Sequence, residues 1–323
     1  MTYQPPLTLT PTMLGLIAKI QQLLGRLEGL GSSVPRPELR RGNRAMAIHS
    51  SCAIEGNSLS LDQVQTILAG KKVLAPAQDI REIANANRAY DLALEWSPHR
   101  IQDFCQAHGV MMDGLIPEAG HFRQGNVGII KGRKVTHIAP KPRVVPQLMS
   151  QLFGYVRASR TIPKAIVASV CHYEIEFIHP FTDGNGRMGR LWQHVILVNE
   201  NPLFGLVPFE SIIQRRQKEY YSTLRQSDLA GESTVFVEFS LDALYLALEK
   251  VWHSYKPTVE TPIQRLIGSQ DHFGSQWFSR KEYLAVHKTL STATASRDLA
   301  MGVSQEILMI EGSKATARYR FKA

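Results

Sequence analysis

The sequence predicts a mainly α-helical protein with two parts, a large helical part and a small C-terminal module. Apolar residues recur at helical spacing along most of the 323-residue chain. Before the last sixty or so residues, one stretch, VGIIKGRKVTHI, alternates as a β-hairpin does. Lys256-Pro257 marks the start of a linker, so we expect the module to begin there.

Start and stop signals place the helices in order. Thr10 can cap the first, with Pro11 at its first position, and Gly31 is expected to end it. Ser60-Leu-Asp-Gln63 has the spacing of a capping box for a short helix that ends near Gly70. Other helices are expected over residues 38–54, 79–96, 146–157, 163–178, 186–199, 209–227 and 236–254. The apolar face of the helix over 79–96 should comprise Ile80, Ile83, Ala84 and Tyr90.

Between the helices, residues 127–137 are expected to form a hairpin that turns at Lys131-Gly132. Three prolines, at 140, 142 and 146, then stop the second strand. In the C-terminal module, Ser279 to Glu282 form a capping box, and Ser291 caps the helix TATASRDLAMG. A terminal hairpin, ILMIEG and ATARYRFK around a Ser-Lys turn, follows. This order of elements resembles a winged helix.

Composition excludes several classes of protein. No run approaches the length of a membrane span, and the N-terminus lacks the pattern of a signal peptide, so we expect a cytoplasmic protein without a membrane partner. The cysteines Cys52, Cys105 and Cys171 are far apart, which indicates reduced thiols rather than a zinc site or disulfides. The net charge of +9 permits nucleotide, nucleic acid or acidic protein partners but selects none.

The stretch HPFTDGNGRMGR, residues 179–190, combines the parts of a phosphate site. Gly184 and Gly186 allow a tight loop whose N–H groups point toward one place. The helix that begins near Gly186 adds partial positive charge. Arg187 and Arg190 share a face of that helix, and guanidinium groups match phosphate oxygens. Two arginines beside such a loop indicate more than one phosphate.

Two further residues of this stretch suggest chemistry at the phosphates. Asp183 stands at the edge of the loop, and Mg²⁺ commonly takes one or two carboxylates together with substrate phosphates. His179 lies at the exit of an apolar helix, where a neutral imidazole can act as a general base. Each part alone is common in loops and turns, but the whole set in one window is not.

Residues 179–190 match, position by position, the HPFx[DE]GNGRxxR motif of the Fic family. The resemblance implies a Fic-type helical core with a hairpin flap, which transfers AMP from ATP to a Ser, Thr or Tyr hydroxyl of a target protein. It implies that His179 is the base, that Phe181 anchors the loop in the core, and that Asp183 holds Mg²⁺. The ATP-binding residues it implies are Asp183, Gly184, Asn185, Gly186, Arg187, Met188, Gly189 and Arg190. Intact Gly184 and Gly186 favour AMP transfer over the phosphoryl transfer of the Doc-like kinases.

Residues 51–57, SCAIEGN, supply a second Fic signature, [ST]xxxE[GN], as Ser51, Glu55 and Gly56. From the residues alone, Glu55 is either a solvated acid near a helix end or a functional group. The resemblance implies that Glu55 pairs with Arg190 at the place of the ATP γ-phosphate and so inhibits the enzyme. In some relatives the same glutamate supports removal of AMP from the target, and this alternative stays open.

The hairpin and a helix complete the expected nucleotide pocket. The resemblance implies that the hairpin covers the cleft and holds the target as an added strand, after the lead-in Gly120 to Arg123. Residues near the nucleotide would be Val127, Gly128, Ile129 and Ile130, together with Tyr220 and Tyr221 of a YYxxL helix. Relatives commonly carry Asn where this chain has Asp228. An edge hairpin and core tyrosines are the structural alternatives.

We therefore expect three regions, 1–98 with the inhibitory motif, 99–255 with the catalytic core, and 256–323 with the winged helix. The last region can bind DNA or protein. Its candidate phosphate contacts are Arg297, Lys314, Arg318, Arg320 and Lys322, whereas Asp298 and Glu306 reduce its positive charge. The resemblance also implies a homodimer. The alternatives are a regulatory protein with a silent core and an enzyme that transfers another nucleotidyl group, such as uridylyl.

Overall fold

The structure, a computed structural model, describes residues 3–29, 37–131, 134–255, 261–288, 290–313 and 316–322. It divides into two compact units, residues 1–255 and 256–323, each with its own hydrophobic core. The elements of the first unit are α1 (Pro11–Glu28), α2 (Pro37–Ile54), α3 (Leu61–Leu68), α4 (Ala77–Asp91), α5 (Ile101–Met111), β1 (Gly128–Lys131), β2 (Lys134–Ile138), α6 (Val145–Ala158), α7 (Lys164–Ile178), α8 (Asn185–Glu200), α9 (Glu210–Arg215), α10 (Gln217–Ala230) and α11 (Thr234–Tyr255). The prediction of a mainly helical protein is confirmed.

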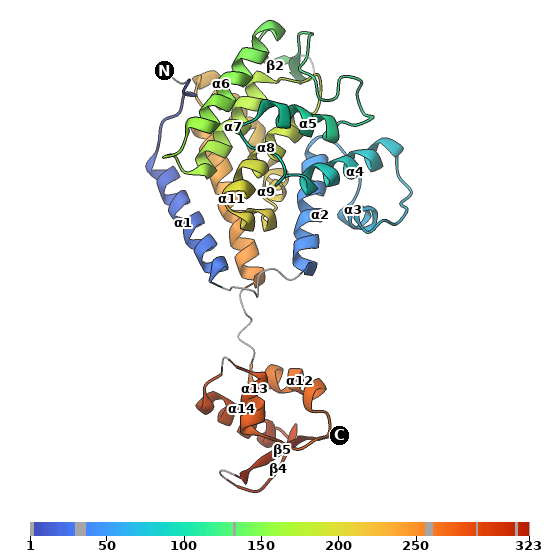
Figure 1. Ribbon diagram of the computed structural model, residues 1–323, viewed down its shortest axis with the longest axis vertical. Helices are drawn as coiled ribbons and strands as arrows, with labels where there is room; N and C mark the ends of the chain where they lie inside the picture. Colours follow the sequence, from blue (N-terminus) through green and yellow to red (C-terminus); the bar gives the residue numbers. More distant parts are fainter. Residues whose placement is uncertain are drawn as a thin grey trace. The chain divides into compact units, whose positions relative to one another are not determined.

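Helices α7 and α8 form the centre of the first unit (Figure 1). Most of their residues are buried, including polar ones, because other helices surround the pair. Helix α11 packs on both α7 and α1, whereas α2 packs on α9, α3 and α4. The expected cap of α1 is present, since Thr10 accepts a hydrogen bond from the Met13 N–H at 3.2 Å. The N-terminal helices therefore share one core with the helices that flank residues 179–184.

A buried polar layer joins α7, α8, α10 and α11. His172 Nδ1 lies 2.7 Å from Gln193 Oε1, and its Nε2 lies 3.0 Å from the Tyr220 hydroxyl. Gln193 in turn donates to the Ser240 hydroxyl at 2.9 Å. Gly189 faces this layer, because a Cβ added to it would lie 2.6 Å from His172 Cδ2. With hydrogen bonds on both sides, the imidazole has little freedom to move away.

Two predicted helices differ from their expected bounds. The helix predicted over 209–227 is interrupted at Arg216, whose φ of −105° and ψ of 29° separate α9 from α10. The Arg216 side chain stabilises this break through ion pairs with Glu219 and Asp242. The helix predicted over 79–96 ends at Asp91, and turns follow it.

The predicted apolar face of α4 was partly wrong. Ile83 and Tyr90 are buried, but Ala84 is exposed, and Asn85 is buried instead. Asn85 can be buried because its side chain donates to the Asp113 carbonyl at 2.8 Å. Helix α5 was not predicted, because its N-cap residue is Arg100 rather than one of the usual capping residues. In the structure Arg100 accordingly makes no side-chain capping bond.

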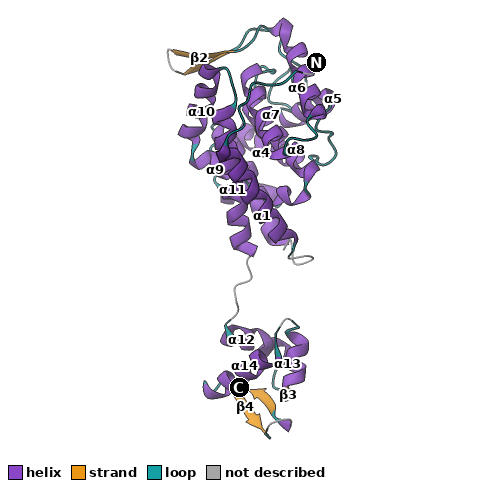
Figure 2. Ribbon diagram, turned by 90° about the vertical axis from the view of Figure 1, so that its left-hand side faces the viewer, coloured by secondary structure: helices purple, strands orange, loops and turns teal. Residues whose placement is uncertain are grey.

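The predicted hairpin is present as β1 and β2, which pair antiparallel with an irregularity between Ile129 and Ile130. Figure 2 shows the hairpin beside α10. Its predicted turn at Gly132, like the predicted end of the first helix at Gly31 and the Lys314 turn, lies outside the described residues. Within the described ranges, α1 ends at Glu28. No helix there combines the length and apolar character that a membrane crossing needs. The three cysteines are free thiols.

The second unit contains α12 (Pro262–Phe273), β3 (Phe278–Ser279), α13 (Arg280–Val286), α14 (Thr292–Ser304), β4 (Leu308–Glu311) and β5 (Arg318–Phe321). Its antiparallel sheet has the order β3-β5-β4. The predicted caps Ser279 and Ser291 are present, whereas α12 and β3 were not predicted. A bidentate ion pair holds α12 to α14, with Arg265 at 2.6 and 2.7 Å from the Asp298 carboxylate.

We predict that Gly189→Ala destabilises the first unit although alanine is the better helix former. The new methyl group would overlap the His172 ring, and overpacking of this kind costs about 1–3 kcal/mol. Gly154→Ala in α6 is the matched control, because no atom lies within 4 Å of the added Cβ, and we expect a gain of up to about 1 kcal/mol. Urea unfolding compares the two variants. Equal effects of both substitutions would contradict the packing account.

A second prediction concerns pH. Burial, and then Arg44, lower the pKa of His194 in α8 to about 3. The unfolded chain binds a proton at His194 near pH 6.5 and the folded chain does not, so this residue makes the free energy of unfolding fall as pH drops below about 6.5. Glu174 and Glu210 act in the opposite sense, since burial raises the pKa of each to about 7. His194→Gln should therefore lose less stability than the parent between pH 6.5 and 4, measured by denaturant unfolding at each pH.

Candidate active site

The site begins where α7 ends. His179 is the C-cap residue, with φ of 50° and ψ of 62°, a left-handed conformation that is strained for a residue other than glycine. Its N–H donates to the Ile175 carbonyl at 2.9 Å, and its Nδ1 lies 3.3 Å from the Glu176 carbonyl. If Nδ1 carries the hydrogen of this bond, then Nε2 is the nitrogen that can accept a proton.

The turn after His179 is held by Phe181 and Asn185. Phe181 is fully buried, as expected of an anchor. The Asn185 side chain brackets the Phe181 backbone, because its Oδ1 accepts from the Phe181 N–H at 2.8 Å and its Nδ2 donates to the Phe181 carbonyl at 2.9 Å. The predicted phosphate contact of Asn185 is thus left to its main-chain N–H, since the side chain closes the turn.

His108 of α5 supports the same turn and was missed from the sequence. Its ring stacks on Phe181 with centroids 3.6 Å apart. The Gly120 N–H donates to His108 Nδ1 at 2.8 Å, so Nε2 carries the hydrogen and donates to the Asp183 carbonyl at 3.0 Å. Burial lowers the pKa of His108 to about 4, which keeps it neutral at pH 7. The available signal was weak, because His108 lies in a helix without a start signal.

Gly184 and Gly186 open α8 as the motif predicts. Gly184 has φ of 82°, and a Cβ there would lie 2.6 Å from Met112 Sδ. A Cβ on Gly186 would overlap a carboxylate oxygen of Glu55. The Glu55 carboxylate therefore lies against the first turn of α8, where main-chain N–H groups and the helix dipole favour an anion.

Two buried arginines carry hydrogen-bond donors without acceptors. Among the described residues, Arg187 Nε, Arg187 Nη1 and Arg190 Nη1 have no hydrogen-bond partner. Arg187 Nη1 lies 3.5 Å from a Glu82 oxygen, a charge contact without hydrogen-bond geometry. Buried guanidinium donors that lack acceptors are costly, so this cluster calls for an anionic ligand. Phosphate oxygens have the right charge and geometry.

Glu55, which directly follows α2, pairs with Arg190. The two side chains form an ion pair of 2.7 Å between Glu55 Oε1 and Arg190 Nη2. Ser51, one turn earlier, accepts from Arg190 Nε at its hydroxyl and from Nη2 at its carbonyl, both at 3.0 Å. Burial lowers the pKa of Arg190, but the Glu55 carboxylate, with Tyr220 and Glu176, outweighs that effect and raises the pKa above its ordinary value. Arg190 is thus a permanently charged, fully buried group.

The turn that carries Glu55 is fixed in place. Gly56 has φ of 100°, and Asn57 Nδ2 donates to the Asp79 carbonyl and to Glu82 Oε2 of α4, at 3.1 and 2.9 Å. Glu82 therefore contacts both the turn that carries Glu55 and Arg187. No spacing in the sequence indicated it, because α4 meets the site only through tertiary packing.

Asp183 is the expected magnesium ligand. Its side chain is largely exposed, its Oδ1 accepts from the Gly184 N–H at 2.6 Å, and its Oδ2 lies 3.4 Å from Arg187 Nη2. In the described part of the chain no three His, Cys, Asp or Glu side chains gather as a metal site. A single carboxylate beside a candidate phosphate site fits Mg²⁺, which normally shares its coordination between protein, phosphates and water.

Several predicted nucleotide contacts lie elsewhere. Met188 is fully buried in the core, and Gly189 packs on His172, so neither faces the anion site with a side chain. Tyr220 is buried, with its hydroxyl donating to Glu176 Oε1 at 2.9 Å, as in the core alternative. Tyr221 is 39% exposed and is the tyrosine of the pair that can reach a ligand.

The hairpin is described only through its backbone at residues 128–130, so the predicted side-chain contacts of Gly128, Ile129 and Ile130 lie outside what is described. Val127, just before β1, lines a groove together with Phe122, Arg123 and Thr182. Since Thr182 belongs to the turn after His179, this groove runs from the start of the hairpin to that turn.

Comparisons with known proteins agree with this geometry. The model of the Fic/DOC family matches residues 98–197. A crystal structure of a Fic family protein from Desulfovibrio desulfuricans G20 is 36% identical, with 99% of each chain covered and a TM-score of 0.76. Fic-1 from C. elegans has the same fold, with a TM-score of 0.61 at 22% identity over 76% of this chain and 72% of that one.

Curated relatives match over most of the chain. The protein adenylyltransferase Fic of Culex quinquefasciatus is 29% identical in an alignment of 271 residues that covers 77% of this chain and 50% of that protein. The protein adenylyltransferase fic-1 of Caenorhabditis elegans is 27% identical in an alignment of 236 residues that covers 69% of this chain and 44% of that protein. The chain thus spans about half the length of these relatives. Together with the full-length match to the Desulfovibrio structure, the motif and its geometry establish that the chain belongs to the Fic family.

Proposed function

We propose that this protein is an adenylyltransferase that moves AMP from ATP to a hydroxyl group of a target protein, and that Glu55 inhibits it. One observation carries the proposal: a carboxylate lies on the first turn of α8, bound to a buried arginine, beside three buried guanidinium nitrogens that lack acceptors. This is a polyphosphate site in which a side chain takes the place of one phosphate. Relatives named protein adenylyltransferase support the choice of reaction.

In the proposed reaction, the target hydroxyl oxygen bonds to the α-phosphorus of ATP while the bond from that phosphorus to the pyrophosphate oxygen breaks. The hydroxyl proton passes to His179, and pyrophosphate leaves with the electron pair of the broken bond. Arg187 and Arg190 would hold the β- and γ-phosphates, and main-chain N–H groups at Gly184 to Gly186 would hold phosphate oxygens. These residues act by positioning and charge stabilisation, on which such transfers mainly depend.

Mg²⁺ would be held by Asp183 together with phosphate oxygens, and when bound it neutralises charge on the α- and β-phosphates. The exposed Asp183 carboxylate and the buried arginine donors that lack acceptors fit a magnesium ion bound to a polyphosphate. Residues 1–98 would then carry the inhibitory segment and residues 99–255 the catalytic core. The alternative in which Glu55 also supports AMP removal, the homodimer and the cytoplasmic location stay predictions.

Inhibition follows from competition for Arg190. With Glu55 on its Nη2, this arginine cannot give all its donors to the γ-phosphate, and the carboxylate repels the triphosphate. We expect ATP to bind less well or with its α-phosphate turned away from the target hydroxyl. Since Ser51 also binds Arg190, the guanidinium keeps its position when Glu55 is removed.

Removal of the Glu55 carboxylate should therefore activate the enzyme. We predict that Glu55→Gly raises AMP incorporation into the protein itself, or into added target, about 30-fold, since a hydrogen bond to a charged group is worth about 2 kcal/mol. Incorporation is measured with labelled ATP and Mg²⁺, and a mass gain of one AMP identifies the product.

Two controls separate the loss of inhibition by Glu55 from general effects of a substitution. Glu95→Gly removes an exposed acid from the turn after α4 and should change nothing. Adding His179→Ala to Glu55→Gly should abolish incorporation while ATP still binds. If Glu55→Gly is no more active than the parent, Glu55 does not inhibit the enzyme. If UTP is used in preference to ATP, the transferred group is uridylyl.

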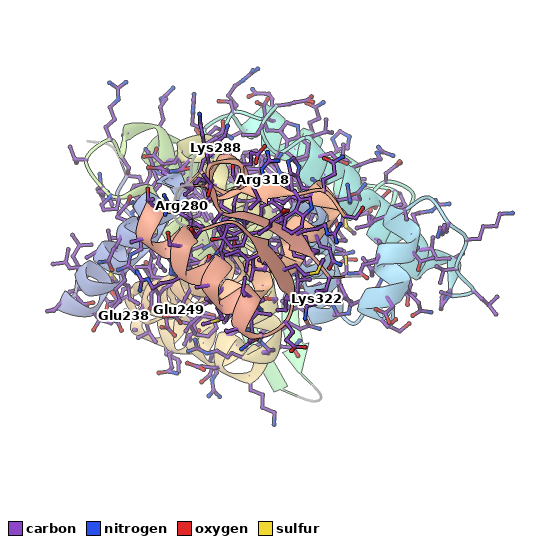
Figure 3. The ribbon with its side chains drawn as sticks, turned by 90° about the horizontal axis from the view of Figure 1, so that it is seen from below. Glu238, Glu249, Arg280, Lys288, Arg318 and Lys322 are labelled. Atoms are coloured by element: carbon purple, nitrogen blue, oxygen red, sulfur yellow. The ribbon has the colours of Figure 1, made fainter. Side chains whose placement is uncertain are left out.

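We further propose that residues 256–323 are a winged helix that binds DNA. The order α12, β3, α13, α14 and then the β4–β5 hairpin supports the assignment. Asp298 was expected to reduce the charge of α14, but it is buried and paired with Arg265. Exposed basic side chains remain around the unit; those labelled in Figure 3 are Arg280, Lys288, Arg318 and Lys322. Arg297 on α14 is also exposed.

DNA binding predicts a steep dependence on salt. Three phosphate contacts would weaken binding about 40-fold between 50 and 200 mM salt. Fluorescence anisotropy with duplex DNA tests this, and the double variant Arg297→Ala/Lys288→Ala should reduce the slope. Arg157→Ala/Arg160→Ala, in the first unit, is the charge-matched control. Absence of binding at 50 mM salt would favour the alternative of a protein partner.

A further inference from the structure

The C-terminal end of α7 is held by a residue outside the catalytic motif. Arg123 lies 56 positions before His179 and is 4% exposed. Its Nε–H donates to the His179 carbonyl at 2.7 Å, and its Nη2 donates to the Ile178 carbonyl at 3.3 Å. Its main-chain N–H donates to the Pro180 carbonyl at 2.9 Å. Arg123 therefore binds three consecutive carbonyls, those of residues 178–180, which we call the His179 corner.

The same guanidinium also binds the main chain at both ends of the hairpin. Arg123 Nη1 donates to the Gly125 carbonyl at 2.9 Å, before β1, and Nη2 donates to the Pro140 carbonyl at 2.5 Å, after β2. Both ends of the hairpin and the His179 corner thus meet at a single planar group. The fork geometry of a guanidinium is needed for this, because an ammonium group cannot reach acceptors in so many directions from one point.

We infer that Arg123 is a positioning residue for AMP transfer, which sets the distance between the target strand on the hairpin and the imidazole of His179. The inference rests on the proposed function. Arg123 does not touch the phosphates in this arrangement, since its polar groups are used by main-chain carbonyls. Its effect on the reaction must pass through the His179 backbone and through the ends of the hairpin.

Physical chemistry supports a positioning role. The last carbonyls of a helix lack partners within the helix, and a cation near them also opposes the negative end of the helix dipole. His179 adopts a left-handed conformation, which is strained for a residue other than glycine. Without Arg123, the carbonyls of Ile178 and His179 lose buried donors, and the strained conformation of His179 loses the contact that favours it.

The experiment uses the full chain with Glu55→Gly as the active parent. We expect Arg123→Ala to lower the maximal rate of AMP incorporation about 100-fold, because small errors in the placement of reacting groups have effects of this size. The ATP concentration for half-maximal rate should stay within about threefold, because the phosphate-binding residues are intact. Arg123→Lys keeps the charge and some donors, so its maximal rate should lie between the rates of the parent and of Arg123→Ala.

The matched control is Arg44→Ala. Arg44 is a half-buried arginine that, like the buried Arg123, donates to a main-chain carbonyl, in this case that of Asn87 at 2.7 Å, and among the described residues none of its hydrogen bonds is to residues 178–180. It should leave the rate unchanged. A rate for Arg123→Ala within threefold of the parent would overturn the inference, as would an equal loss of ATP affinity, which would place the effect on nucleotide binding. Unfolding lowers the rate without changing the ATP requirement, so a loss of rate that matches the unfolded fraction seen by circular dichroism would also overturn it.

Hydrogen exchange gives a readout that does not depend on activity or on the alanine variant. In Arg123→Lys with Glu55 intact, peptides over 124–127 and 178–184 should exchange faster, whereas the peptide over 51–57 should not. Unchanged exchange in both segments would overturn the inference. If the Glu55→Gly parent transfers no AMP, the proposed function fails, and the exchange measurement still decides whether Arg123 holds the corner and the hairpin together.

Discussion

The buried charge of Arg190 is the constraint on which the arrangement of the first unit depends. Its side chain is fully buried in the centre of the molecule, where an unpaired cation is costly. Glu55 neutralises the charge and Ser51 satisfies two further donors, so α2 has to lie against the start of α8. One guanidinium thus joins α2 to α8, within the hydrophobic core that the N-terminal helices share with α7 and α8.

Around that charge, the turn from His179 to Gly184 is held from all sides by groups that do not belong to the motif. His108 of α5 binds the Asp183 carbonyl, and Arg123 binds the carbonyls before it. Asn185, within the motif, closes the turn on Phe181. These contacts leave the main-chain N–H groups at the start of α8 and the arginine side chains as the groups that can bind an anion. Rigid support of this kind is what a positioning mechanism requires.

The candidate site was predicted unevenly from the sequence. Residues that are close in the chain, such as His179, Asp183, Arg187 and Arg190, were recognised because a short turn and one helix face bring them together whatever the rest of the fold does. Glu55 was recognised only through the family signature, since its local sequence also suits a solvated helix end. His108 and Glu82 were not assigned roles, because nothing local distinguishes them from ordinary helix residues. Arg123 was recognised only as part of the lead-in to the hairpin, and its contacts with the turn at His179 were not predicted.

By itself, the sequence determined the mainly helical character, the capping boxes, the hairpin, the break near residue 256 and the glycine-containing turn between α7 and α8. These features depend on periodicity, caps and glycine conformations, which act over a few residues. Only the tertiary structure decided which polar side chains face the turn, that Asn185 and Gly189 have structural roles, and that Asp298 is neutralised by Arg265 inside the second unit. The physical reason is that burial and pairing of polar groups are set by contacts between segments far apart in the chain, and no local pattern records those contacts.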